Sequence, residues 1–416
     1  MRKMLAPQGR PRAEVLREMR DFKATDCDWT HGRAPLFVFK ASDSLYEFGR
    51  AAFVEYFSEN ALGGGRAFPS VKRMEDDVVE MALSLFSAPD GAQGFMSTGG
   101  TESIVQAMQT CRDWNRRRRG QARHRGNIVM SETGHPAFNK GAKLMDLDVR
   151  RVPVGPGLEL DAAALESAID EDTIMLVGSA PNFSYGSIDP ITELGAMALR
   201  RDVWLHVDAC VGGYLAPFVR QIGRDIPAFD FAVPGVASIS ADLHKFGFCP
   251  KPASTVFYRD ADKARHHHFD CNVWPNGRFL TGTLVGTRPA GGVAGAWATF
   301  QHLGVEGYRD IARALMGFID RYKAGITAIP GLKLLGQPHL SIVAFGSDEV
   351  DIFRVAEVMA RDGWLPGLVQ KPKGIHRMMS MIHEPSLDEY LQAVRTALAE
   401  VRGQGPQRQA TIKATY

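Results

Sequence analysis

The chain has few cysteines, a small net charge and no long apolar run. Its five cysteines are spread over 416 residues, and no two of them stand at Cys-x-x-Cys spacing. An odd number without such spacing argues against a disulfide framework and against a cysteine-based zinc site. A reducing compartment suits such a chain, so we expect a cytoplasmic protein.

The net charge is only +2, so no global attraction to polyanions is expected. One basic run, Arg116–Arg119, follows a segment with helical spacing, and a solvated helix end explains it without a nucleic-acid partner. His266–His268 are adjacent, so their side chains point in different directions, and no carboxylate or cysteine spacing supports a metal site there. We therefore expect neither nucleic acid nor metal as a ligand.

No apolar run approaches the roughly 18 to 20 residues that span a bilayer. The first residues, MRKMLAPQGRPR, are basic, but no apolar segment follows them, which argues against a secretion signal. The composition, with 45% apolar and 23% charged residues, is typical of a globular protein, and the length suits two domains. We expect no membrane span.

Residues 92–245 alternate between short apolar runs and stretches with helical spacing, which is the pattern of βαβ units around a mostly parallel sheet. The predicted strands are 127–132, 148–154, 173–180, 203–210 and 238–242, and the predicted helices are 103–115, 162–170 and 191–200. Near residue 300 the pattern changes to helices that enclose short strands. That change indicates a second, smaller α+β layer.

These changes of pattern predict four parts of the chain. They are an N-terminal helical segment 1–60, a large cofactor-binding domain 61–300, a small C-terminal α+β domain 301–402 and a disordered tail 403–416. A glycine-rich break at 63–65 lies at the first boundary, and the polar composition of the last residues favours disorder.

Residues 94–103, GFMSTGGTES, have the features of a phosphate-binding turn. The pair Gly99-Gly100 lets the backbone approach an anion closely, and the helix predicted just after it points its first N–H groups to the same place. Thr98 and Thr101 add hydroxyl donors. A Gly-Gly turn before a helix can also be purely structural, so this motif alone is a weak signal.

Asp208 ends an apolar run, WLHVD, and a carboxylate there would lie at the carboxyl edge of a parallel sheet, where α/β proteins bind ligands. It could keep a pyridinium nitrogen protonated, or it could simply cap a turn. Lys245 follows another short run, SISAD, and partial desolvation would favour its neutral, nucleophilic form, although a lone lysine is usually a surface residue. A phosphate turn, an Asp and then a Lys is the order found in pyridoxal-phosphate (PLP) enzymes of the aminotransferase fold.

The sequence resembles the sphingosine-1-phosphate lyase family, within the PLP-dependent group II decarboxylase superfamily. The matching stretches are STGGTES, HVDACVGGYLAPF, FDFAVPGVASISADLHKFGF and TRPAGGVAGAWAT, and weaker similarity runs from about Pro7 to His383. The resemblance implies an α/β, type I PLP-dependent transferase fold. This fold has a mostly parallel seven-stranded sheet flanked by helices and a smaller α+β C-terminal domain.

The resemblance also implies roles for individual residues. Lys245 holds PLP as a Schiff base, Asp208 pairs with the pyridine nitrogen and His135 stacks on the cofactor ring. The residues implied to bind the cofactor are Gly99, Gly100, Thr101, His135, Asn182, Asp208, Ser240, His244, Lys245, Gly286 and Thr287. Gly286 and Thr287 match a pair that reaches the phosphate from the partner subunit, which implies a homodimer with composite active sites.

The substrate half of the site departs from the family pattern. Phe39 stands where the lyases have Tyr, Gly63 stands where they have His, and Phe279 lies in RFLTGT where they have IYASPT. Lys251, a phosphate contact in the family, is retained. Losing a phenol and an imidazole removes a hydrogen-bond donor and an acid–base group. Arg278 and Arg66 are additional cations that could bind another anion or could be surface residues.

The resemblance implies a PLP-dependent lyase that cleaves the Cα–Cβ bond of a β-hydroxy amine, a small molecule that may carry a phosphate, to an aldehyde and an amine. The alternative is an L-amino-acid decarboxylase or an aldolase with a non-sphingoid substrate. A different class of hypothesis is a scaffold or regulator with a PLP-enzyme fold. The presence of Lys245, Asp208 and His135 together argues against it, since a scaffold gains nothing from this set.

Overall fold

The computed structural model describes residues 2–404 and 410–414. The strands are β1 Gln93–Ser97, β2 Asn127–Ser131, β3 Asp148–Val152, β4 Thr173–Ser179, β5 Trp204–Asp208, β6 Val236–Ala241, β7 Ser254–Tyr258, β8 Phe269–Trp274, β9 Gly277–Thr281, β10 Lys333–Leu335, β11 Ile342–Gly346, β12 Gly367–Gln370 and β13 Lys373–Met378. The α-helices are α1 Arg12–Phe22, α2 Asp43–Glu55, α3 Pro69–Leu85, α4 Gly100–Arg119, α5 Ala137–Met145, α6 Ala162–Ser167, α7 Ile191–Arg201, α8 Ala216–Gln221, α9 Ala261–Ala264, α10 Ala290–Thr327, α11 Ile352–Arg361 and α12 Leu387–Gly403. Four short 3₁₀ helices are η1 Lys23–Thr25, η2 Trp29–His31, η3 Ala61–Gly63 and η4 Met381–Ser386.

The central sheet has seven strands in the order β1-β7-β6-β5-β4-β2-β3. Strands β3, β2, β4, β5 and β6 pair in parallel, and β7 is antiparallel to both of its neighbours, β6 and β1. Every residue of β2, β4, β5, β6 and β7 is buried. A sheet covered on both faces needs such continuous apolar strands. The predicted fold class, a mostly parallel seven-stranded sheet flanked by helices, is confirmed.

Alternate residues of one strand enter different cores. Ile128 and Met130 of β2 pack in a cluster with α4 and α5, whereas Val129 between them belongs to a larger cluster on the other face. Successive side chains of a strand point to opposite faces of the sheet, so each buried strand feeds both layers. The larger cluster extends over α7, α8 and α10 into the C-terminal layer.

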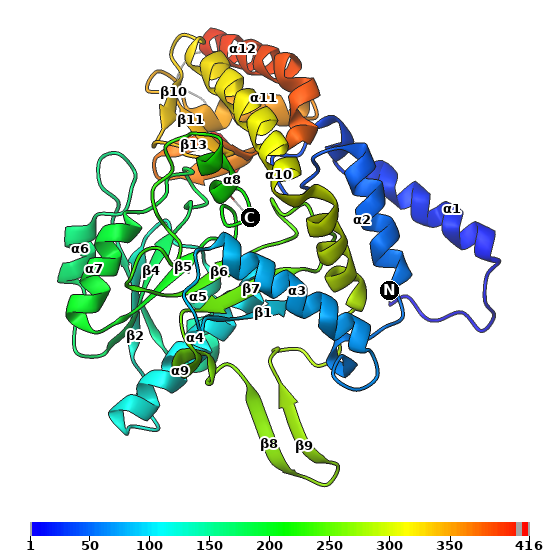
Figure 1. Ribbon diagram of the computed structural model, residues 1–416. Coiled ribbons are helices and arrows are strands. Elements are labelled where there is room, and N and C mark those ends of the chain that lie inside the picture. The colour runs from blue at the N-terminus through cyan, green and yellow to red at the C-terminus, as the bar shows by residue number, and fades with distance from the viewer. Residues whose placement is uncertain (1, 405–409, 415–416) are drawn as a thin grey trace.

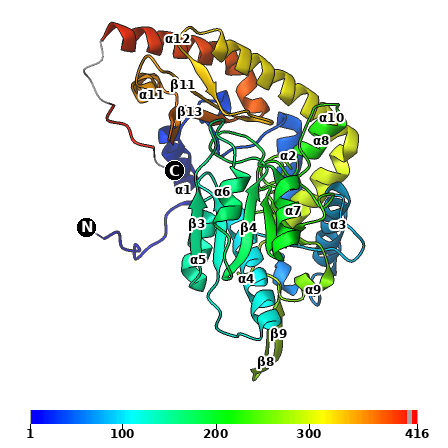
Figure 2. The same cartoon turned by 90° about the vertical axis from the view of Figure 1, so that its left-hand side faces the viewer.

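The C-terminal layer is a four-stranded antiparallel sheet in the order β10-β11-β13-β12, with α11 and α12 packed beside it. Figures 1 and 2 show α10 running from the large sheet to this smaller layer. α10 is interrupted at Gly304, which has a positive φ of 52°. The predicted α+β layer is confirmed. The domain limits at 60, 300 and 402 stay predictions, and α10 runs through the second of them.

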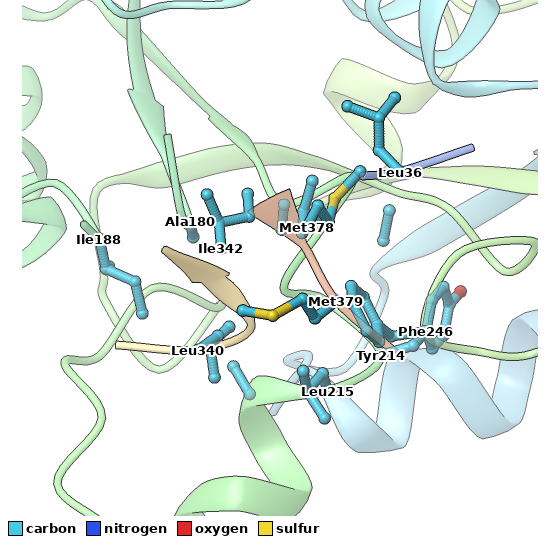
Figure 3. Close-up of a cluster of buried hydrophobic side chains, with 14 of the residues drawn as sticks. Leu36, Ala180, Ile188, Tyr214, Leu215, Phe246, Leu340, Ile342, Met378 and Met379 are labelled. Carbon is cyan, nitrogen blue, oxygen red and sulfur yellow. The ribbon is translucent and has the colours of Figure 1, made fainter. Parts of the chain in front are cut away.

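Residues from both layers meet in a buried cluster (Figure 3). Tyr214 and Phe246 come from loops of the large sheet, while Ile342 and Met378 come from the C-terminal sheet. All four side chains are buried, with at most 2% of their surface exposed. Because Phe246 directly follows Lys245, burial of its ring fixes the lysine loop between the two layers.

The β8–β9 hairpin extends away from the body in both ribbon views. Its strands are largely exposed, in contrast to those of the two larger sheets. His266–His268 follow the short helix α9 and lead into this hairpin.

The predicted tail 403–416 lies partly outside the described residues, at 405–409 and 415–416. Of the described part, the N–H of Ile412 donates to Oε1 of Glu357 at 2.8 Å, which attaches the end of the chain to α11. Across residues 2–404 and 410–414, none of the helices has the length and apolar character to cross a membrane.

Candidate functional site

A cavity of about 370 Å³ lies at the carboxyl edge of the large sheet. Strands β1, β2, β4, β5 and β6 all end towards this edge, and loops that follow parallel strands converge there. The predicted residues that line the cavity are Gly99, Gly100, Thr101, His135, Asp208, His244 and Lys245. The structure therefore brings together most of the residues that the sequence assigned to the cofactor.

Lys245 is ion-paired in this cavity. Its Nζ donates to Oδ2 of Asp242 at 2.9 Å, and only 2% of the Asp242 side chain is exposed. Burial disfavours the ammonium form, but the carboxylate outweighs burial, so the pKa of Lys245 is raised above its ordinary value. The expectation that desolvation favours a neutral lysine is therefore wrong for this arrangement, because an acidic partner lies within hydrogen-bond distance.

Asp242 is a site residue that the sequence reasoning missed. Ser254 Oγ donates to its Oδ1 at 2.5 Å, and Lys245 holds its other oxygen. Burial opposes ionisation, yet Lys245 and then His244 keep the pKa of the Asp242 carboxyl below its usual range. The available signal was its position three residues before Lys245, directly after a buried strand.

His244 lies between the ion pair and a second cavity. Its Nε2 is 3.7 Å from Oδ2 of Asp242, and its Nδ1 accepts from the N–H of Ala253 at 3.4 Å, so Nε2 bears the hydrogen of the neutral ring. Burial lowers the pKa of His244. The imidazole is therefore neutral at pH 7.

Asp208 is held at one oxygen from two directions. Cys210 N donates to Oδ1 at 3.1 Å, and Ser240 Oγ donates to the same atom at 3.4 Å. Beneath them, Nε2 of the fully buried His206 lies 3.2 Å from Ser240 Oγ. Ser240, assigned to the cofactor from the sequence, thus orients Asp208 from below the cavity.

His135 forms part of the wall near Asp208. Its Nδ1 accepts from the N–H of Ala137 at 3.2 Å, so a neutral ring bears its hydrogen on Nε2. Burial lowers the pKa of His135, with Asp208 opposing. The ring of Phe183 stands edge-on to the imidazole at 6.3 Å between centroids. A neutral, aromatic-backed ring suits the stacking role predicted for His135.

Gly100 begins α4 and brings its first turn against the ion pair. A Cβ there would lie 2.8 Å from Asp242 Oδ2 and 2.8 Å from Cys210 Sγ, so only glycine fits this approach. The first N–H groups of a helix have no partner within it and favour an anion at their end. This turn fits the phosphate of a cofactor whose aldehyde carbon is held at Lys245. The hydroxyl of Thr98, expected as a donor here, is instead bonded to Glu102.

Three of the predicted cofactor residues lie elsewhere. Asn182 uses its amide within its own turn, donating to Ser187 O at 3.1 Å and accepting from Tyr185 N at 2.8 Å. Gly286 and Thr287 are exposed, and Thr287 Oγ1 accepts from Asn60 Nδ2 at 3.3 Å. None of the three lines the Lys245 cavity of its own chain.

The predicted substrate residues divide into two groups. Phe39 and Lys251 line a second cavity of about 400 Å³, which shares His244 with the first. Lys251 Nζ donates to the carbonyl of Phe37 at 2.5 Å, and burial followed by the charge of Lys245 lowers the pKa of Lys251. The ring of Phe39 stands edge-on to that of Phe246 at 5.0 Å.

Gly63 and Phe279 belong to the other group. Gly63 ends η3, and Phe279 lies in β9, where its ring is 6.0 Å from that of Trp274. Neither residue lines either of the two cavities. Arg278, considered as an anion ligand, pairs with Asp270 across the hairpin at 2.8 Å.

The features set aside in the sequence have local partners. His267 is buried, its Nε2 lies 2.6 Å from Gly282 O and its Nδ1 lies 2.9 Å from Tyr258 Oη. In the basic run, Arg118 pairs with Asp202 at 2.7 Å. Within the described part of the chain, no group of three or more His, Cys, Asp or Glu side chains is arranged to hold a metal ion.

Comparisons with known proteins relate the chain to PLP-dependent enzymes. Residues 65–347 match the pyridoxal-dependent decarboxylase conserved domain. A sphingosine-1-phosphate lyase of Oryza sativa is 37% identical over 94% of this chain and 73% of its own length. A probable L-tyrosine/L-aspartate decarboxylase of Methanothermobacter thermautotrophicus is 31% identical over 86% of this chain and 95% of its own. The structure of a sphingosine-1-phosphate lyase of Burkholderia pseudomallei superimposes with a TM-score of 0.92, at 37% identity over 97% of this chain and 94% of its own.

Proposed function

Because the chain belongs to the sphingosine-1-phosphate lyase family of PLP-dependent enzymes, we propose that it cleaves the Cα–Cβ bond of a β-hydroxy amine to an aldehyde and an amine. The observation that carries the proposal is the arrangement of Lys245, Asp208 and the first turn of α4 around one cavity. The chain is a PLP-dependent lyase. The identity of its substrate and the residues that bind the substrate are proposals.

Bound PLP supplies a ring that accepts the electrons released when a bond at the substrate Cα breaks. Lys245 would hold its aldehyde carbon, and the first turn of α4 with Thr101 would hold its phosphate. Asp208 would keep the ring nitrogen protonated. The two hydrogen bonds to Asp208 both go to Oδ1, so we expect Oδ2 to meet that nitrogen.

Lys245 must lose a proton before its nitrogen can bond to carbon. Asp242 lies 2.9 Å away and is the nearest acceptor for that proton. Once the amine is neutral, an ionised Asp242 would lack its partner in a buried position, which disfavours the carboxylate. The proton would therefore stay on Asp242, close to where the substrate amine would approach Lys245.

The substrate would enter beside His244, where Phe39 and Lys251 line the second cavity. Lys251 is the cation that could bind an anionic group on the substrate, such as a phosphate. Phe39 adds apolar surface but no hydrogen bond at the position where the family has a phenol. A substrate with a smaller or differently placed anion is compatible with these residues.

A homodimer with composite sites is part of the proposal. The hairpin and the segment after it expose large apolar side chains, among them Val273 at 87%, Leu284 at 57% and Trp274 at 50%. Exposed apolar groups that gather on one projection mark interaction surfaces. Gly63, Phe279, Gly286 and Thr287 lie in η3, β9 or the adjoining loop. In a homodimer these residues of one copy would complete the site of the other copy.

We also propose a cytoplasmic location. All five cysteines, Cys27, Cys111, Cys210, Cys249 and Cys271, are free thiols. A reducing compartment preserves such thiols.

The test is a substrate panel on the protein reconstituted with PLP. Phosphorylated amino alcohols, β-hydroxy amino acids and plain amino acids are incubated separately, and aldehyde and carbon dioxide are both assayed. Aldehyde release from a β-hydroxy amine is expected. Carbon dioxide without aldehyde would replace the proposal with decarboxylation, the alternative that the 31% identical decarboxylase relative favours. Lys245→Ala should abolish turnover in every case.

A further inference from the structure

Glu102, in the first turn of α4, joins two segments that are far apart in the sequence. Its Oε2 accepts from the N–H of Thr98 at 2.8 Å and also from the Thr98 hydroxyl. Its Oε1 accepts from the N–H of Leu284 at 2.8 Å. Only 7% of the Glu102 surface is exposed, so the carboxylate is held almost entirely by these donors.

The two segments belong to different halves of the proposed composite site. Thr98 directly precedes Gly99-Gly100 and lines the Lys245 cavity of its own chain. Leu284 lies two residues before Gly286 in the exposed loop that would reach the partner. Leu284 is 57% exposed, so its backbone is fastened to α4 while its side chain faces outward.

A second pair of contacts fastens the same loop one turn further along α4. Gln106 Nε2 donates to the carbonyl of Gly282 at 2.7 Å, and His267 Nε2 meets the same oxygen at 2.6 Å. The backbone at 282–284 is therefore attached to the helix at two levels. A shift of the first turn of α4 would be transmitted to the loop, because neither attachment is through a flexible, exposed side chain.

The chemistry of Glu102 suits a shared contact. A carboxylate offers two acceptor oxygens and no donor, so it can accept from both sides at once, whereas an amide of the same shape offers one acceptor and an opposing N–H₂ group. A negative charge in the first turn of a helix is also favoured by the helix dipole. The position therefore favours an acid over its amide.

We propose that Glu102 is a positioning residue that couples the phosphate turn of its own site to the 282–287 loop of its partner's site, so that the two sites bind PLP cooperatively. This inference rests on the proposed homodimer with composite sites. Phosphate bound at Gly99–Thr101 would fix the backbone at Thr98, which donates to Glu102. Glu102 in turn accepts from the N–H of Leu284, so it would fix the loop that reaches the partner's site. Coupling of this kind is reciprocal between the two sites.

The test is a PLP titration of the cofactor-free protein, followed by the absorbance of the bound cofactor. For two coupled sites the Hill coefficient of the unaltered chain should lie between about 1 and about 2. Glu102→Gln should reduce it to about 1 and weaken half-saturation by roughly fivefold or more. Asp113→Asn, on the same helix but paired with its neighbour Arg112 at 2.8 Å, is the matched control and should leave both values unchanged.

Dimer mass and melting temperature are measured on each cofactor-free variant, since a merely structural role would alter these and leave the Hill coefficient of the surviving dimer unchanged. If Glu102→Gln does not fold, Gln106→Ala takes its place, because it removes the contact of α4 with the Gly282 carbonyl, which then keeps only His267, and leaves the Thr98 contact intact. If the unaltered chain is a dimer but its two sites bind PLP independently, the proposed coupling is wrong and the homodimer stands. If the unaltered chain is a monomer, the homodimer is wrong as well. If Glu102→Gln binds PLP with the same cooperativity as the unaltered chain, Glu102 does not couple the sites.

Discussion

The Nζ atom of Lys245 lies 2.9 Å from Oδ2 of Asp242, which is three residues earlier in the same turn after β6. The contact places a buried negative charge beside the amine that is proposed to react with the cofactor. Because a neighbouring opposite charge favours the ionised form of both partners, the pair sets the pH at which Lys245 becomes a nucleophile.

Asp242→Asn should move the reactivity of Lys245 to lower pH. The amide keeps the shape but removes the charge, so burial dominates and the pKa of Lys245 falls. The measurement is the rate of PLP uptake by the cofactor-free protein as a function of pH. The midpoint of that profile should shift down. Asp202→Asn, whose exposed carboxylate pairs with Arg118, is the control, and equal profiles for both variants would contradict the effect.

Asp208→Asn should reduce kcat by at least about a hundredfold, since an amide cannot hold the ring nitrogen protonated. PLP should remain bound, because Lys245 and α4 are untouched. Ser240→Ala removes one hydrogen bond to Asp208, worth about 1 kcal/mol, and should lower kcat by about fivefold. Steady-state kinetics and cofactor absorbance separate these effects. Ser167→Ala, at an exposed position of helix α6, should change neither.

Gly100→Ala should weaken PLP binding by about tenfold or more. The new methyl group would lie 2.8 Å from both Asp242 Oδ2 and Cys210 Sγ, so the first turn of α4 must withdraw from the cavity. Gly317→Ala in α10 is a matched control, because its methyl group would meet nothing closer than Arg321 at 3.9 Å. Equilibrium titration with PLP gives both affinities. Equal affinities would show that the turn tolerates a side chain.

Acid should destabilise the protein partly through His267. Burial lowers the pKa of this ring to about 3, well below the value of about 6.5 expected in the unfolded chain. Because the pKa of this ring is lower in the folded state, the ring contributes its full stability at pH values above its unfolded-state pKa. That contribution is lost as the pH falls from about 6.5 towards about 3. The loss for one such group approaches about 1.4 kcal/mol per pH unit in this window.

His267→Gln has no titrating ring, so its free energy of unfolding should fall less steeply than that of the unaltered chain between about pH 7 and about pH 5. Denaturant unfolding at the two pH values gives the comparison. His31→Gln, at an exposed position near the N-terminus, is the control that should keep the full slope. If His267→Gln does not change how steeply the free energy of unfolding falls with pH, the acid sensitivity comes from other buried groups.

The strands of the large sheet could be predicted because both faces of the sheet are covered. A strand such as Thr173–Ser179 then has an apolar interior, residues 174–178, between two buried polar ends, and the predicted range 173–180 differs from the observed one by one residue. The β8–β9 hairpin was not predicted. It packs on neither core, so no burial pattern selected its residues, and the alternation that identifies a strand is absent.

That Asp208 and Lys245 lie at one edge of the sheet could be predicted for a related reason. Asp208 and Lys245 follow neighbouring parallel strands, β5 and β6, and such strands end at the same edge of a sheet. The contact of Glu102 with Leu284 could not be predicted. It joins residues 182 positions apart through a loop whose path no local pattern specifies. The local contacts of Asn182, which the resemblance implied to bind the cofactor, could not be predicted either, because its turn uses both ends of the amide.

The sequence by itself determined the fold and indicated the cofactor, because burial patterns and the glycine turn are local properties of the chain. Only the tertiary structure decided the charge state of Lys245 and which predicted residues share its cavity. Electrostatic interactions depend on distances through space, and those distances are set by how separate segments pack. The sequence contains 47 acidic residues and does not distinguish Asp242 from the others. In the structure, the turn after β6 places its carboxylate beside the amine of Lys245.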